Sequence, residues 1–184
     1  MKIQFNTKFL SFFFSIIIYF LSSHSLHAES VKDFQIEGIS LGDSALKYYS
    51  KEEIKKSSRD HFNDKTFTAT QNYPLDFFKN YDYFDYTFRT NDKNFIIVSM
   101  AGVITYEGKD INDCYKKMEK IDDDVKSILE NMERTEGNKI KSKSDQTGIS
   151  TFSQITYQGS DGVINITCYD NTSRENNMSY LSVS

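Results

Sequence analysis

Residues Tyr81 to Tyr106, YDYFDYTFRTNDKNFIIVSMAGVITY, predict two strands joined by a turn. In the first strand, one face carries Phe84, Tyr86 and Phe88, and the other carries Tyr81, Tyr83, Asp85, Thr87 and Arg89. This two-residue alternation is typical of a half-buried strand. The turn falls at residues 91–94, because the Asn and Asp residues there tolerate left-handed backbone angles.

The second strand of this hairpin is expected to run from Phe95 to Tyr106. Its core face would consist of Ile96, Val98, Met100, Ile104 and Tyr106. Gly102 interrupts that face and indicates a bulge, or a place where another group approaches the backbone closely. The whole segment therefore predicts a long antiparallel hairpin.

An amphipathic helix is predicted from Asp110 to Met132. Apolar residues recur there every three or four positions and form one stripe: Ile111, Cys114, Tyr115, Met118, Ile121, Val125, Ile128, Leu129 and Met132. Asp110 is suited to cap the helix, and Asp113 in the first turn is favoured by the helix dipole.

The C-terminal third predicts a second hairpin. Arg134 to Gly148 is polar and indicates a mobile loop. Ser150 to Gln158 and Val163 to Tyr169 predict two strands around the turn sequence GSDG at 159–162. Met178 to Val183 predicts a further strand at an edge of the sheet.

The two cysteines are predicted to form a disulfide bond. Cys114 lies on the apolar stripe of the predicted helix, and Cys168 lies on the apolar face of the last hairpin strand with Ile164 and Ile166. An even cysteine count favours pairing in a chain that folds in an oxidising compartment. Two separate thiols, or a pair of metal ligands, are the alternatives.

The N-terminal part predicts short elements. Val31 to Ser40 is expected to form a strand, and Asp43 is expected to cap a short helix. Ser50 and Glu53 form a capping-box pattern that starts a second helical segment over 51–59. Asn63 to Thr70 is a further strand candidate.

The first 28 residues have the pattern of a secretory signal peptide. Lys2 and Lys8 precede an apolar run from Phe9 to Leu21, and a polar stretch ends at the small residue Ala28. The run is short for a transmembrane helix of about 20 residues. We expect cleavage after Ala28, with a cut after Ser25 or an uncleaved anchor as alternatives. The chain is then periplasmic or secreted, and contacts a membrane only transiently through the signal peptide.

The composition restricts the possible partners. Removing 28 of 184 residues leaves one domain of 156 residues, over 29–184, with 20 basic and 26 acidic side chains and a net charge of −6. Binding to nucleic acid is not expected, because phosphate contacts need clustered Lys or Arg. Frequent Lys, Asn, Ile and Tyr with one proline are typical of an AT-rich bacterial genome.

Three motifs could suggest chemistry, and none is complete. Gly38 to Gly42 matches the Gly-x-Ser-x-Gly nucleophile elbow around Ser40, but a downstream acid followed by a histidine is missing. His61 alone cannot form a zinc site. Asp122, Asp123 and Asp124 fan outward on a helix, which favours a solvated face over a cation site. The sequence thus predicts no catalytic residue, no metal and no cofactor.

One surface remains as a candidate binding site. Tyr81 and Tyr83 fall on the strand face that also carries Asp85 and Arg89. Exposed tyrosines beside polar groups can stack on sugars or pack against a partner protein. Burial of this face beneath another element is the alternative.

Three segments carry a resemblance: GISLGDS at 38–44, NDK at 91–93 and DCYKK at 113–117. In these, and over most of the region after the signal peptide, the chain resembles a group of small exported proteins from AT-rich marine alphaproteobacteria. The resemblance implies a signal peptide, an α+β domain and a paired cysteine. It implies no activity and no site residue.

Taken together, the sequence predicts an α+β domain. Five or six antiparallel strands would pack against one long amphipathic helix and a short N-terminal helical segment. The expected function is an exported, non-catalytic binding or scaffold module for a protein or glycan. A small periplasmic hydrolase that uses a pair of carboxylates is the alternative.

Overall fold

The computed structural model describes residues 30–59, 62, 65–72, 76–107, 111–129, 132–142, 150–171 and 178–184. The predicted signal peptide with its cleavage site, His61 and the expected helix cap Asp110 lie outside these ranges. None of the helices within these ranges is both long and apolar enough to cross a bilayer.

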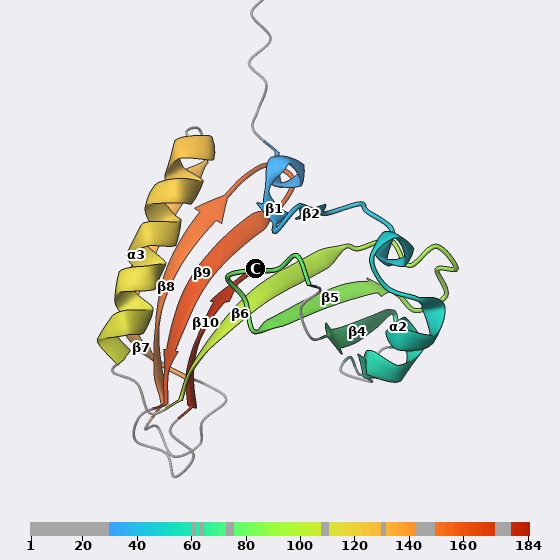
Figure 1. The fold of residues 1–184 in the computed structure, drawn as a ribbon. Coiled ribbons are helices and arrows are strands. Elements are labelled where there is room, and N and C mark those ends of the chain that lie inside the picture. The colour runs from blue at the N-terminus through green and yellow to red at the C-terminus, as the bar shows by residue number, and fades with distance from the viewer. Residues whose placement is uncertain are drawn as a thin grey trace, which may run out of the picture.

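The main feature of the fold is one antiparallel sheet, which confirms the α+β class (Figure 1). It has eight strands, so the expected number of five or six is wrong. In spatial order the strands are β3 (Ser58–Arg59), β4 (Phe67–Asn72), β5 (Tyr83–Arg89), β6 (Ser99–Glu107), β10 (Met178–Val183), β9 (Val163–Asp170), β8 (Thr151–Gln158) and β7 (Glu133–Lys141).

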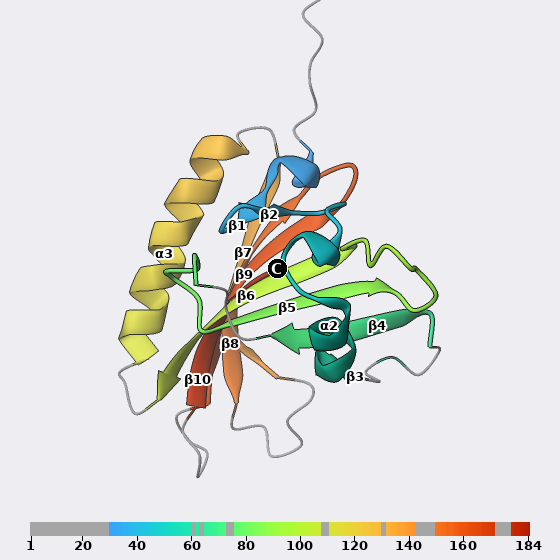
Figure 2. The same cartoon turned by 45° about the vertical axis from the view of Figure 1, so that its right-hand side comes forward.

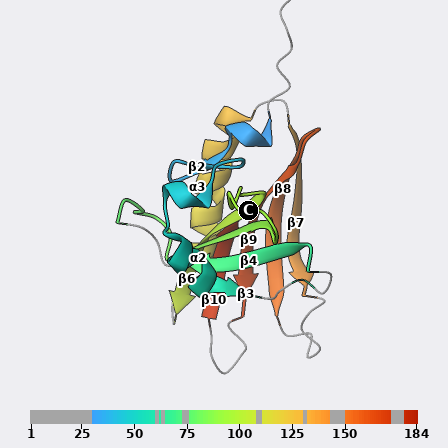
Figure 3. The same cartoon turned by 90° about the vertical axis from the view of Figure 1, so that its right-hand side faces the viewer.

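Helices and the N-terminal segment cover one face of this sheet (Figures 1, 2 and 3). The long helix α3 (Ile111–Ile128) confirms the amphipathic pattern and packs on β9 and β10. The shorter helix α2 (Lys51–Ser57) begins at the capping box of Ser50 and Glu53, as the sequence predicts. In the described part of the chain, no helix covers the other face, which we call the open face.

The first predicted hairpin is present as β5 and β6, but its second strand starts later than expected. Tyr83 pairs with Val103 and Thr87 with Ser99, so β6 begins at Ser99 and not at Phe95. Phe95 has a positive φ of 50°, which takes residues 95–98 out of the ladder. As a result Phe95 and Ile97 are buried, whereas Val98 is 42% exposed.

Two strand predictions in the C-terminal third need correction. The expected polar loop after Arg134 contains β7, a nine-residue strand at the edge of the sheet, with a bulge between Gly137 and Ile140. The expected edge strand β10 lies instead in the interior of the sheet, between β6 and β9. The hairpin of β8 and β9 is confirmed.

The N-terminal strand prediction is also wrong. Residues Val31–Asp33 form a 3-10 helix, followed by a small hairpin of β1 (Gln35–Ile36) and β2 (Ile39–Ser40). Gly38 turns this hairpin with a φ of 84°. A second 3-10 helix, Ala45–Lys47, is capped by Ser44, and not by Asp43.

Two apolar clusters lie beneath this cover. The α3 cluster joins Cys114, Met118 and Val125 to side chains of β8, β9 and β10. The N-terminal cluster joins Ile36, Ile39, Tyr49 and Ile54 to the buried face of β5. Phe34, Leu41 and Tyr81 pack against both clusters and connect them.

The predicted disulfide bond is present. Cys114 of α3 and Cys168 of β9 are bonded, with 6.1 Å between their Cα atoms. Both cysteines are completely buried in the α3 cluster. The bond therefore ties the long helix to the middle of the sheet.

Candidate functional site

A hollow of about 330 Å³ lies on the open face, over β4, β5 and β6. Ala69 of β4 lies opposite Thr87 of β5, and Thr87 lies opposite Ser99 of β6. In the next row, Gln71 lies opposite Asp85, which lies opposite Ala101. Small side chains at most of these positions leave a hollow of a size that suits a small ligand or a single large side chain. We call it the Asp85 pocket.

Asp85 is the unusual residue of this pocket. Its side chain is half-buried, and its Oδ1 atom is buried without a hydrogen-bond partner. Such an atom is costly, because a buried acceptor that has lost water gains nothing in return. Burial raises the pKa of Asp85 above its ordinary value, and the positive charge of Arg59 only partly opposes this. A half-buried carboxylate with one buried, unsatisfied oxygen in a hollow is a typical mark of a functional site.

Two larger side chains stand beside the carboxylate. Arg59 comes from the two-residue strand β3, where it lies opposite Ala69 and therefore on the open face. Phe62, which is 37% exposed, also lines the pocket. The pocket therefore offers a carboxylate, a guanidinium and an aromatic ring within one small hollow.

The structure separates the four residues of the predicted tyrosine surface. Tyr83, Asp85 and Arg89 lie on the open face, as the alternation predicts, but only Asp85 lines the pocket. Tyr81 lies on the covered face: a Cβ atom added to Gly102 would come within 2.6 Å of the Tyr81 ring. Of the two alternatives predicted for Gly102, the structure shows the close approach of another group, the Tyr81 ring, and no bulge at this position.

The surroundings of Tyr81 also affect its pKa. Burial, with Glu37 and Asp124 nearby, raises the pKa of Tyr81 to about 12. Tyr81 packs against both apolar clusters, so it belongs to the core and not to a binding surface.

This placement predicts unequal effects for the two tyrosines. Tyr81→Ala should lower the free energy of unfolding by about 2–3 kcal/mol, because it removes a ring that joins the two clusters. Tyr83→Ala, on the open face, should cost less than about 1 kcal/mol. Urea unfolding of both variants, followed by circular dichroism, provides the comparison. Equal losses in the two variants would contradict the separation of these residues.

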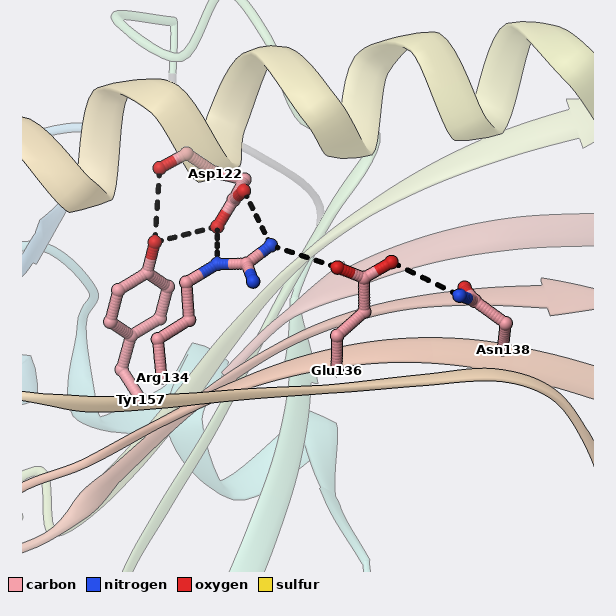
Figure 4. Close-up of polar contacts among 5 residues, drawn as sticks. All are labelled: Asp122, Arg134, Glu136, Asn138 and Tyr157. Atoms are coloured by element: carbon pink, nitrogen blue, oxygen red, sulfur yellow. Dashed lines mark hydrogen bonds and ion pairs between the residues drawn. The ribbon is translucent and has the colours of Figure 1, made fainter.

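A larger hollow, of about 840 Å³, lies between α3 and the β7–β8 hairpin. Figure 4 shows four of its polar residues, Asp122, Arg134, Glu136 and Asn138, together with the neighbouring Tyr157. Arg134 of β7 donates to Asp122 of α3 twice, from Nε to Oδ1 at 2.9 Å and from Nη2 to Oδ2 at 2.8 Å. The Tyr157 hydroxyl donates to the same Oδ1 atom at 2.6 Å. Glu136 accepts from Arg134 and from Asn138.

These groups satisfy one another. Burial raises the pKa of Asp122, but hydrogen bonds from Arg134 and Tyr157 outweigh it, so the pKa is lowered overall. Burial and the adjacent Asp122 raise the pKa of Tyr157 to about 12. At neutral pH the cluster is therefore a fixed carboxylate, phenol and guanidinium. Its chemistry is that of a structural clamp, which holds the edge strand β7 against α3.

The structure also places the remaining sequence motifs. Asp122 points toward the sheet, so the prediction of a purely solvated acidic face is wrong for this residue, whereas Asp123 and Asp124 are exposed. Ser40 lies in the β1–β2 hairpin, where its amide donates to Asp43 at 3.1 Å. Among the described residues, no group of three or more His, Cys, Asp or Glu side chains is arranged to hold a metal ion.

Sequence reasoning missed Arg59, Phe62 and the small side chains of the pocket. They come from four separate strands and a connecting segment, and only the strand register brings them together. Asp85 itself was visible as a polar residue on a strand face. No protein-family model, curated protein or solved structure matches the chain.

Proposed function

We propose that the protein is an exported, non-catalytic binding module whose ligand occupies the Asp85 pocket. The observation that carries this proposal is the buried Oδ1 atom of Asp85, which has no hydrogen-bond partner. A ligand that donates a hydrogen bond there would offset a cost that the free protein bears. Binding sites commonly retain such locally unfavourable groups.

Export is supported by two features. The first 28 residues have the charge, apolar run and small final residue of a signal peptide. The buried disulfide bond is typical of proteins that fold in an oxidising compartment. We therefore propose a periplasmic or secreted location.

The geometry favours binding over the carboxylate hydrolase. A pair of catalytic carboxylates must face a shared substrate at a separation of about 5–10 Å. Among the described residues that line the pocket, Asp85 is the one carboxylate. Three carboxylates, Glu119, Asp122 and Glu136, line the larger hollow, and Arg134 forms ion pairs with the last two. This leaves one carboxylate of that lining outside the ion pairs of the described residues, where the hydrolase would need two.

Asp85 predicts an unusual dependence of stability on pH. Its pKa is raised in the folded state, so the folded protein holds this proton more tightly than the unfolded chain does. This stabilisation is fully present when the pH is below the ordinary pKa of Asp. It is lost as the pH rises through the raised pKa of Asp85 in the folded protein. Asp85→Asn should therefore be more stable than the natural protein at neutral pH, and should lack this loss.

Asp92 provides a control of opposite sign. Backbone hydrogen bonds from Ile96 and Asn94 lower the pKa of Asp92. The stabilisation that Asp92 provides is therefore present when the pH is above the ordinary pKa of Asp, and it is lost on acidification. Thermal melts from acidic to neutral pH should show opposite trends for Asp85→Asn and Asp92→Asn. A destabilised Asp85→Asn protein at neutral pH would mean that Asp85 has a structural role.

Native mass spectrometry tests the binding function directly. Protein recovered from periplasm without denaturation should carry a bound small molecule, which Arg89→Gln retains and Asp85→Asn loses. Arg89 is a suitable control because it lies on the open face beyond the residues that line the pocket. The denatured mass of the same sample should correspond to a chain that begins at Glu29. The proposed site would be contradicted if the natural protein, Arg89→Gln and Asp85→Asn carried the molecule to the same extent, or if none of the three carried one.

A further inference from the structure

The Asp85 pocket contains two opposite charges that do not pair with each other. Neither Arg59 nor Asp85 takes part in any of the ion pairs among the described residues. Arg59 nevertheless lies close enough for its charge to act on the Asp85 carboxylate. A cation and an anion that share a hollow without contact leave room for a molecule between them.

The strand register fixes their relative positions. Arg59 lies on β3 and Asp85 on β5, with β4 between them, and their rows are two residues apart. Standard strand spacing places their Cα atoms on a diagonal of about 12 Å. On β4, the strand between them, Ala69 pairs with Arg59 and Gln71 pairs with Asp85. Ala69 is short, Gln71 is exposed, and both line the pocket together with the two charged residues. The two charged side chains thus reach the same hollow from two different strands.

The charges also discriminate among simple ligands. A ligand with only a positive charge would pair with Asp85 but would be repelled by Arg59. A ligand with only a negative charge would pair with Arg59 but would be repelled by Asp85. A ligand with both charges satisfies both side chains, and its carboxylate can accept two parallel hydrogen bonds from a guanidinium.

We propose that the pocket binds a small zwitterion, whose ammonium group donates to Asp85 and whose carboxylate accepts from Arg59. This inference rests on the proposed function and names its ligand class. The volume of about 330 Å³ limits the ligand to the size of a free amino acid or the terminal part of a peptide. Neither a covalent step nor a cofactor is required.

Nuclear magnetic resonance titration of the full protein with matched probes tests the proposal. Glycine, β-alanine and γ-aminobutyrate vary the distance between the two charges. Glycinamide keeps the ammonium group without the carboxylate, and N-acetylglycine keeps the carboxylate without the ammonium group. A dipeptide, glycylglycine, distinguishes a peptide terminus from a free amino acid. The reporters are the amides of Thr87, Ser99 and Ala101, which border the pocket, and the amide of Met118 in α3 is the reference.

We expect at least one zwitterion to shift the pocket amides and to bind about 10- to 100-fold more tightly than glycinamide or N-acetylglycine. Arg59→Gln should reduce its affinity to that of glycinamide, and Asp85→Asn to that of N-acetylglycine. Arg89→Gln should bind as the natural protein does. Binding should also weaken as the pH falls and Asp85 becomes protonated.

These experiments distinguish failure of the zwitterion inference from failure of the proposed binding site. If glycinamide binds as tightly as every zwitterion and Arg59→Gln has no effect, the ligand is a simple cation. The zwitterion inference is then wrong while the binding site stands. If no probe shifts the pocket amides and the protein recovered from periplasm carries no molecule that Asp85→Asn loses, the pocket is not a binding site and both are wrong.

Discussion

The variant in which both Cys114 and Cys168 are replaced by alanine is expected to lose about 4 kcal/mol of unfolding free energy. The two cysteines are separated by 54 residues, so the bond closes a long loop and restricts the unfolded chain strongly. In the folded protein it connects α3 to β9 at a fully buried position. The loss should appear as a lower urea midpoint in equilibrium unfolding.

Reduction of the natural protein is the matched control. It opens the loop but keeps both sulfur atoms, so it should account for most of the loss without the small cavities that alanine leaves. Thiol titration of the untreated protein should detect no free thiol. A loss below about 1 kcal/mol in both experiments would mean that the bond contributes little to stability.

Phe84→Ala is expected to cost about 3–5 kcal/mol, the range for deletion of a buried aromatic ring. Phe84 is completely buried in the N-terminal cluster, with ring centroids of Phe78 and Tyr86 at 5.4 and 5.7 Å. Phe77 provides a matched control, because it belongs to the same chain of rings but is 46% exposed. Phe77→Ala should cost less than about 1 kcal/mol in the same urea experiment.

The same variant tests whether residues 29–184 form a single domain. Phe34, Leu41 and Tyr81 join the two clusters, so loss of Phe84 should lower the stability of α3 as well as that of β5. Amide hydrogen exchange should show this as reduced protection in both elements. Unchanged protection in α3 would indicate two units that unfold independently.

Side-chain periodicity accounts for most of the elements that could be predicted. The stripe on α3, the alternation in β5 and the hairpin of β8 and β9 each repeat apolar residues at the period of their structure. The same pattern on α3 and β9 placed Cys114 and Cys168 on facing apolar surfaces.

Elements that are held mainly by backbone pairing show no apolar periodicity in their sequence. In β7, eight of nine residues are exposed and the ninth is half-buried, so its sequence has no apolar face. Its place depends on the ladder with β8 and on the contact of Arg134 with Asp122. Nothing in the sequence marks Arg134 and Asp122 as partners. Phe95 caused an error of the opposite kind. The alternation of side chains predicts a strand that includes Phe95, but its left-handed backbone interrupts the strand there.

The candidate site was only partly predictable for a similar reason. Asp85 was visible as a polar residue on a strand, but its burial depends on neighbours from β4 and β6. Arg59 is separated from it by 26 positions in the chain and reaches the pocket through a two-residue strand. Register, which fixes which residues become neighbours across strands, is a tertiary property that one sequence specifies weakly at short edge strands.

The position of β10 has a consequence for the timing of folding. Without Met178–Val183, the sheet falls into two separate pieces, β3 to β6 and β7 to β9, since β10 is the strand that pairs with both β6 and β9. A chain under synthesis therefore cannot close the sheet until residues 178–183 have been made. Deletion of residues 178–184 would likewise remove the connection between the two halves of the domain.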